Sequence, residues 1–232
     1  MLAQIALICS MISAVCANTE KTIFLGPPTV NIASAHPALD DLRLHTLTPQ
    51  DFQIRTHLEA RFPINELLHG KPTWLLLDQL REGQRYEVRV CWAATQPTAF
   101  KMNTYELQTV FETPELISEL SEYSWSRQSI DDAGTAIPIK PLETEREASV
   151  LFLQILVAAD YYTTNTTLMR QVPPVYVDII LDPFVYNILP RSLIPTVAYI
   201  LIVAVTTWFL AQRISLWIRE AAKGSDLEKK DQ

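Results

Sequence analysis

The chain has 232 residues, 48% of them hydrophobic, and a formal net charge of −7 at pH 7. This length suits one domain with a membrane anchor, and the acidic balance excludes a nucleic-acid-binding protein that relies on basic patches. The sequence contains no glycine-rich phosphate-binding loop and no G-x-S-x-G element, so no cofactor is predicted.

The first seventeen residues, MLAQIALICSMISAVCA, are mostly apolar from Leu2 to Val15. Small residues at Val15 and Ala17 suit signal peptidase, so we predict a signal peptide over residues 1–17, cleaved after Ala17. The run is shorter than the about 20 apolar residues that a membrane span needs. Because no Lys or Arg precedes the run, an uncleaved anchor and a buried amino-terminal strand remain as alternatives.

A β-rich domain is expected over residues 18–182. Its clearest signal is a period-two pattern in which apolar side chains alternate with polar ones, at Tyr86, Val88, Val90 and Trp92. The predicted fold class is therefore mainly β: an immunoglobulin- or fibronectin III-like β-sandwich with a short helix, plus one C-terminal transmembrane helix.

The turn before this strand resembles the E–F corner of immunoglobulin-like and fibronectin III sandwiches. In that corner a tyrosine hydroxyl is hydrogen-bonded to the backbone a few residues upstream. Leu80, Gly83 and Tyr86 would occupy its positions. The resemblance covers architecture only and implies no function.

Further runs are expected to complete the domain. Residues 52–62 fit a strand or a helix, and we favour a strand. Residues 113–125 predict a short helix, since Pro114 suits the first helical position, and the polar residues 126–147 predict an exposed loop. Other runs with strand-like composition are 21–25, 42–47, 149–162 and 173–181, of which we expect the last two to pair.

Residues with catalytic or metal-binding chemistry form no motif. The four histidines lack metal-ligand spacing, so no catalytic or metal-binding residue is predicted. Cys91 is the one cysteine outside the predicted signal peptide; it could bridge to another chain, although a small strand residue is the more ordinary interpretation. Because paired carboxylates need no motif, a lumenal hydrolase remains an alternative.

Asn165 begins the sequence Asn-Thr-Thr, which matches the acceptor pattern for N-glycosylation. We predict that Asn165 is glycosylated, which requires this part of the chain to lie in the lumen of the endoplasmic reticulum.

A proline-rich juxtamembrane segment is predicted at residues 183–192. Its apolar and aromatic side chains could lie in the interfacial zone of a bilayer or contact a partner protein, or the segment could be a stiff linker. The candidates for partner contact are Phe184, Tyr186, Ile188 and Leu189.

One transmembrane helix is predicted at residues 193–212. No charged residue lies between Arg191 and Arg213, and a charge at the bilayer centre costs at least about 2.5 kcal/mol on insertion scales. Together with the signal peptide, this span places the amino-terminal domain in the lumen and the tail, residues 213–232, in the cytosol.

The tail ends in KKDQ, with Lys229 and Lys230 at the fourth and third positions from the carboxy terminus. In the cytosol this spacing matches the dilysine signal that coat proteins bind during retrieval to the endoplasmic reticulum. The alternative is a solvated charged tail. We predict an endoplasmic reticulum membrane protein.

The segments FETPELISELSEYSWSRQ and VPPVYVDIILDPFVYNILPRSLIPT resemble fungal members of the GPI-mannosyltransferase II co-activator family. The resemblance implies a non-catalytic subunit whose partner is a multi-spanning mannosyltransferase. That partner adds the second mannose to the glycosylphosphatidylinositol (GPI) precursor from dolichol-phosphate-mannose. The alternatives are an accessory subunit of another reticulum complex, for membrane-protein insertion or for the first mannose, and a lumenal enzyme or cargo receptor.

Overall fold

The computed structural model describes residues 17–32, 39–64, 69–131 and 145–228. The predicted signal peptide therefore lies outside the described residues except for Ala17, the first residue of strand β1. Lys229 and Lys230 also lie outside them.

The first sheet is antiparallel and has the order β1–β6–β9, with β4 and β10 paired to successive parts of β9. We call it sheet 1. Its strands are β1 (Ala17–Leu25), β4 (Gln53–Leu58), β6 (Arg85–Ala93), β9 (Val175–Val185) and β10 (Leu189–Pro190).

The second sheet, sheet 2, is built around β8, which pairs with β2, β5 and β7, while β3 pairs in parallel with the far edge of β5. Its strands are β2 (Val30–Ile32), β3 (His45–Leu47), β5 (Lys71–Leu80), β7 (Thr98–Glu106) and β8 (Arg146–Ala159). Gly70, which precedes β5, has a φ of +86°, and a Cβ there would lie 2.0 Å from the carbonyl oxygen of Val157. Only glycine permits this approach.

The two sheets pack face to face around one apolar core. On β6, the expected alternation holds: Val88 and Val90 are fully buried in this core, and Arg89 between them faces outward. Every second residue of β5 and β8 contributes from the other side, including Leu75, Leu77 and Leu153. The predicted mainly β sandwich is confirmed.

The tyrosine corner is present. β5 belongs to sheet 2 and β6 to sheet 1, so the chain crosses between the sheets at this point. The Arg81 backbone N–H donates a hydrogen bond to the Tyr86 hydroxyl (2.9 Å), which donates to the side-chain oxygen of Gln84 (3.2 Å). Because the ring is buried, the pKa of Tyr86 is raised above its ordinary value.

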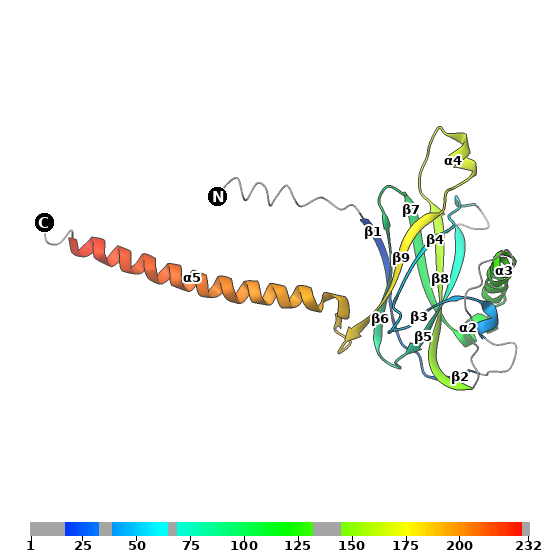
Figure 1. The fold of residues 1–232 in the computed structure, drawn as a ribbon, viewed down its shortest axis with the longest axis horizontal. Coiled ribbons are helices and arrows are strands. Elements are labelled where there is room, and N and C mark those ends of the chain that lie inside the picture. Colours follow the sequence, from blue (N-terminus) through cyan, green and yellow to red (C-terminus); the bar gives the residue numbers. More distant parts are fainter. Residues whose placement is uncertain (1–16, 33–38, 65–68, 132–144, 229–232) are drawn as a thin grey trace.

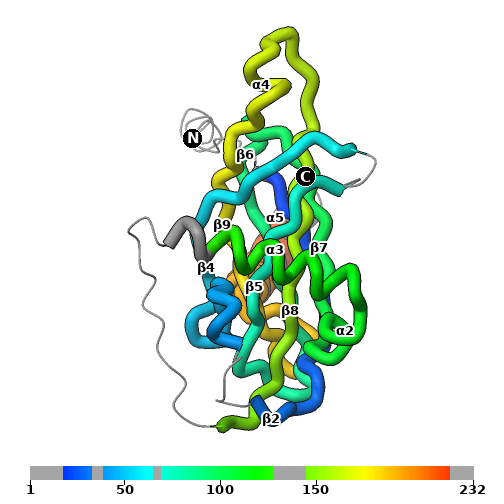
Figure 2. Tube along the Cα trace, turned by 90° about the vertical axis from the view of Figure 1, so that its right-hand side faces the viewer, coloured from blue at the N-terminus to red at the C-terminus, as the bar shows by residue number. Residues whose placement is uncertain are grey.

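The outer face of sheet 2 is covered by α2 (Leu107–Glu112) and α3 (Pro114–Asp131), as Figure 2 shows, and by the short helix η1 (Leu39–Leu42). A second apolar cluster fills this layer, with Trp74, Leu120 and Phe152 fully or almost fully buried. β8 is thus buried on both faces, which explains why its sequence is almost continuously apolar.

Three sequence-based expectations need correction. The predicted short helix continues to Asp131, so residues 126–131 of the predicted loop are helical. Its last turns are held against the domain, because the Arg127 side chain donates to the Arg43 carbonyl oxygen (2.9 Å). β8 and β9 do not pair with each other; each is a central strand of a different sheet. Within residues 42–47, only the part from His45 is a strand.

The carboxy-terminal helix α5 (Ile194–Glu228) follows the single turn η2 (Arg191–Leu193). Within the stretch Arg191–Arg219, an 18-residue window has a mean hydropathy of 2.1, and the stretch is long and apolar enough to cross a membrane. α5 includes most of the predicted span at 193–212 and continues beyond it. Figure 1 shows α5 leaving the lower end of sheet 1 and extending away from the sandwich, transverse to the strands.

Candidate functional site: the corner beside the apolar helix

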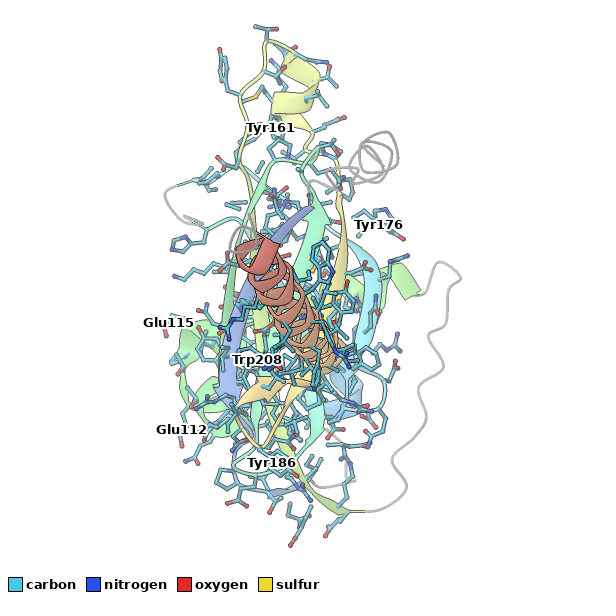
Figure 3. The ribbon with its side chains drawn as sticks, turned by 90° about the vertical axis from the view of Figure 1, so that its left-hand side faces the viewer. Glu112, Glu115, Tyr161, Tyr176, Tyr186 and Trp208 are labelled. Carbon is cyan, nitrogen blue, oxygen red and sulfur yellow. The ribbon has the colours of Figure 1, made fainter. Side chains whose placement is uncertain are left out.

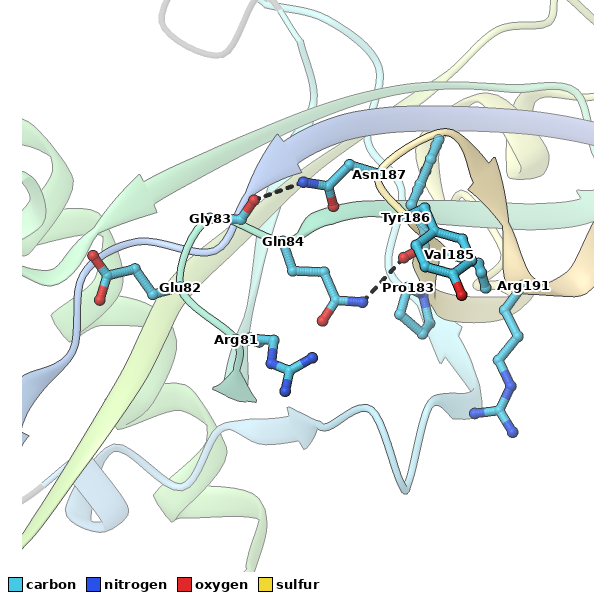
Figure 4. A pocket seen from close by; sticks show the side chains of 10 residues that line it. Arg81, Glu82, Gly83, Gln84, Pro183, Val185, Tyr186, Asn187 and Arg191 are labelled. Atoms are coloured by element: carbon cyan, nitrogen blue, oxygen red, sulfur yellow. Dashed lines mark hydrogen bonds between the residues drawn. The ribbon is translucent and has the colours of Figure 1, made fainter.

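The end of the sandwich next to α5 is formed by two turns and η2. We call it the anchor corner and define it as residues 81–85 of the β5–β6 turn and residues 183–192. These two segments, about a hundred residues apart in sequence, lie side by side in Figure 4 and line an open groove of about 730 Å³.

The β9–β10 turn has an unusual backbone. The Ile188 N–H donates to the carbonyl oxygen of Val185 (3.1 Å), and Tyr186 and Asn187 both have positive φ, 52° and 58°. Two successive positive φ values are the pattern of a type I′ hairpin turn. Asn tolerates this conformation, whereas a bulky aromatic residue rarely adopts it, so Tyr186 is held there by its surroundings.

Asn187 joins the two turns. Its side-chain oxygen accepts from the Arg85 backbone N–H (2.8 Å), and its side-chain nitrogen donates to the Gly83 carbonyl oxygen (2.9 Å). Nearby, the Gln84 side chain donates to the carbonyl oxygen of Phe184 (3.1 Å). Three hydrogen bonds therefore hold the β9–β10 turn on the tyrosine corner, two of which are drawn in Figure 4.

Gly26, the residue directly after β1, is bonded to the anchor corner. The Gly26 N–H donates to Gln84 O (2.8 Å), and the Gly83 N–H donates to Gly26 O (2.9 Å). A Cβ on Gly26 would lie 2.2 Å from the carbonyl oxygen of Arg81. This close approach requires glycine at position 26.

The turn η2, which precedes α5, is also bonded to the sheet. Both carboxylate oxygens of the buried Asp182 accept from the backbone N–H of Ser192 (3.3 Å each). Asp182 stands opposite Glu87, a second buried carboxylate. Arg89 lies within 3.8 Å of the first and 3.5 Å of the second, and Lys21 contacts Glu87 at 3.0 Å. Cations are needed here because two uncompensated buried carboxylates would be strongly destabilising.

The rest of the outer face of sheet 1 carries paired polar side chains. Arg55 donates to both carboxylate oxygens of Asp178 (2.6 and 2.8 Å), which lowers the pKa of that carboxyl group. Tyr176 packs against His57 with ring centroids 4.7 Å apart. Figures 1 and 3 together show that this face looks toward the side into which α5 extends.

The predicted contact residues of the juxtamembrane segment separate into two groups. Tyr186 is 90% exposed and Ile188 79% exposed, while Leu189 is half-buried in β10. Phe184 is a correction: it is only 6% exposed, because it still belongs to β9 and lies beneath the guanidinium of Arg85 (5.8 Å). The alternative of a stiff linker does not describe the whole segment, since residues 183–185 and 189–190 belong to sheet 1.

The other predicted sites lie away from the anchor corner. Asn165 is exposed and caps the short helix α4 (Thr166–Arg170), where its side chain accepts from the Thr167 N–H (3.0 Å). Figure 1 places α4 at the opposite end of the sandwich. Cys91 is free, half-buried on the outer face of β6, and 3.5 Å from the Thr19 hydroxyl. No group of three or more potential metal ligands occurs among the described residues.

Sequence reasoning missed Asn187, Asp182 and Gln84. An asparagine between two short strand-like runs is a turn signal that could have indicated Asn187. Nothing local indicates the role of Asp182, because its partners depend on the strand register and on the fold of η2.

These features define a class of protein: a β-sandwich whose corner is fixed to one helix that is long and apolar enough to cross a membrane. The family model described as Pga1, GPI-mannosyltransferase II co-activator, matches residues 8–214, and the chain belongs to that family. The family resemblance expected from the sequence is confirmed. GPI biosynthesis takes place at the endoplasmic reticulum, so the protein is associated with that compartment. A comparison with curated proteins and with solved structures gave no match.

Proposed function

We propose that this protein is a non-catalytic subunit that binds the multi-spanning catalytic subunit of GPI-mannosyltransferase II and supports addition of the second mannose. The observation that carries the proposal is the extent of the family match. Residues 8–214 include the sandwich, the anchor corner and most of the apolar part of α5. The match therefore covers both the β-sandwich and the apolar helix, and not one of these parts alone.

The proposed mechanism is stabilisation by binding. A subunit that binds only the folded catalytic subunit stabilises the folded state by mass action. At a free concentration of a hundred times Kd, this stabilisation is about 2.7 kcal/mol. Two surfaces are available for this contact. α5 is exposed from residue 194 to residue 219 and carries small and hydroxyl residues, including Thr196, Ala204 and Thr207, of the kind used in helix contacts within lipid. The sandwich presents the second surface.

The proposed orientation places the sandwich in the lumen and the carboxy terminus in the cytosol. It is supported by the predicted signal peptide at residues 1–17, the predicted span at 193–212 and the solvent-exposed N-glycosylation acceptor at Asn165. Lys229 and Lys230 would then face the coat proteins. Replacing both with Ser should release the protein from the reticulum to later compartments, scored by Golgi processing of the Asn165 glycan. Unchanged retention would remove the retrieval signal from the account.

Affinity purification of the full chain in a mild detergent tests the partnership. We expect the multi-spanning GPI-mannosyltransferase II catalytic subunit to copurify in a defined ratio. Recovery of subunits of an insertion complex or of the first-mannose enzyme would contradict the proposal and support another accessory role. Mannosyl transfer by the purified protein alone would show that it is itself an enzyme.

A further inference from the structure

We propose that the β9–β10 turn is a second membrane contact, in which Tyr186 and Ile188 insert into the interfacial layer of the leaflet that α5 enters. The inference rests on α5 crossing the bilayer, as proposed above. It adds to that function a lipid-binding element, whose ligand is the headgroup and upper acyl region of a phospholipid bilayer.

The tip of the turn has the composition of an interfacial anchor. Tyr186 and Ile188 are the two most exposed large side chains between β9 and η2, at 90% and 79%. Tyrosine is favoured at membrane–water interfaces because its ring is apolar and its hydroxyl is polar. A type I′ turn facing water normally uses Asn and Gly, and the aromatic and aliphatic residues here are not needed to form the turn.

The tip is also rigid. Asn187 is bonded to Gly83 and Arg85 through both side-chain atoms, and Tyr186 is held at a positive φ that costs free energy. The backbone of the turn cannot move away from the tyrosine corner without breaking these bonds. A rigid projection loses little conformational entropy on binding, which suits insertion into a surface.

The position of the tip relative to α5 supports lipid as the occupant. Ile188 precedes the first residue of α5 by six positions, and Asp182 holds η2 against the sheet. Figure 1 and Figure 3 both show the turn, with Tyr186 labelled in the latter, next to the starting end of the helix. The charge-free stretch 192–212 has the length of about 30 Å that a bilayer core requires. The bilayer surface therefore lies at the level of the turn.

Charge around the tip fits phospholipid headgroups. The groove at the anchor corner is lined by Arg81 and Arg191 with Glu82 as its one carboxylate, and Arg85 lies over Phe184 beside it. The protein as a whole is acidic, so this local excess of basic side chains is opposite in sign to the net charge of the chain. Arginine side chains bind the phosphate groups of phospholipid headgroups through charge-assisted hydrogen bonds. Two attachments, α5 and the turn, would fix the outer face of sheet 1 toward the bilayer.

The test places an environment-sensitive NBD fluorophore at the tip of the full-length protein. Cys9, Cys16 and Cys91 are replaced with Ser, and Ile188→Cys is labelled. Tyr162→Cys is the matched control, because Tyr162 is 86% exposed in the loop before α4 at the opposite end of the sandwich. The proteins are reconstituted without partner into phosphatidylcholine vesicles, with and without phosphatidylinositol. Extraction at alkaline pH establishes separately whether α5 is inserted.

We expect the emission at position 188 to shift to shorter wavelength and to be quenched by lipids spin-labelled near the headgroup, more so with phosphatidylinositol. Position 162 should show neither change. A water-like emission at 188 in a protein that resists alkaline extraction would overturn the inference and leave the proposed function intact. A shift that requires the catalytic subunit would overturn it in favour of a protein contact. Complete alkaline extraction would remove the premise shared with the proposed orientation.

Discussion

Replacing Trp74 with Ala should lower the free energy of unfolding by about 3–5 kcal/mol, the range for truncating a large aromatic residue in a core. Trp74 is fully buried between sheet 2 and the helices that cover it. Its ring meets Phe152 edge to face, with centroids 6.1 Å apart. Truncation would leave a cavity where the second apolar cluster packs on the outer face of sheet 2.

The same change would disrupt a polar network. The Trp74 indole N–H donates to a carboxylate oxygen of Glu119 on α3 (3.1 Å), and the Gln154 side chain donates to the same oxygen. Gln154 in turn accepts from Asn103 (2.8 Å). Loss of one donor to a partly buried carboxylate adds to the cost of the cavity, so we expect the upper part of the range.

Trp125→Ala is the matched control for this substitution. Trp125 lies on α3 and is 70% exposed, and changes at such positions usually alter stability by no more than about 0.5 kcal/mol. Unfolding of the full-length protein in detergent by urea, followed by circular dichroism, measures both variants. Equal midpoints for the two variants would contradict the three-layer packing of sheet 1, sheet 2 and the helices.

Sequence patterns predicted the features of this fold that depend on neighbouring residues. The alternation from Tyr86 to Trp92 gave the strand and the face that it buries, and the spacing of Leu80, Gly83 and Tyr86 gave the tyrosine corner. In both cases the signal and the structure involve residues within the same dozen positions, so local periodicity and turn chemistry were sufficient.

Features that depend on contacts distant in sequence were not predictable in this way. The end of α3 is set in part by Arg127 and the carbonyl oxygen of Arg43, which are far apart in the sequence. β8 pairs with β2, β5 and β7, whereas β9 pairs with β4, β6 and β10, and both sequences read equally well as buried strands. Local periodicity carries no information about strand partners.

At the candidate site, too, the features set by neighbouring residues were predictable and those set by distant contacts were not. The apolar character of Tyr186 and Ile188 was visible in the sequence, and both are exposed as a contact residue must be. Phe184 belongs to the same apolar run but is buried, and the guanidinium of Arg85 lies over its ring. The hydrogen bonds of Asn187 join residues about a hundred positions apart and could be recognised only in the fold.

Depletion of this protein should produce a strong block in GPI-anchor synthesis at one step. Under the proposed mechanism the catalytic subunit of GPI-mannosyltransferase II depends on this protein for its folded form, so depletion lowers the amount of competent enzyme. The expected result is a several-fold accumulation of the precursor with one mannose and a matching loss of later precursors. Re-expression of the Trp125→Ala variant should restore the normal profile, and re-expression of the unstable Trp74→Ala variant should restore it only in part.

The most direct measurement is the distribution of lipid-linked GPI precursors, labelled with radioactive mannose and separated by chromatography, in cells with and without this chain. Our account predicts that the one-mannose species dominates after depletion, while the dolichol-phosphate-mannose donor remains available. Normal amounts of precursors with two or more mannoses, or accumulation of a species with no mannose, would contradict it.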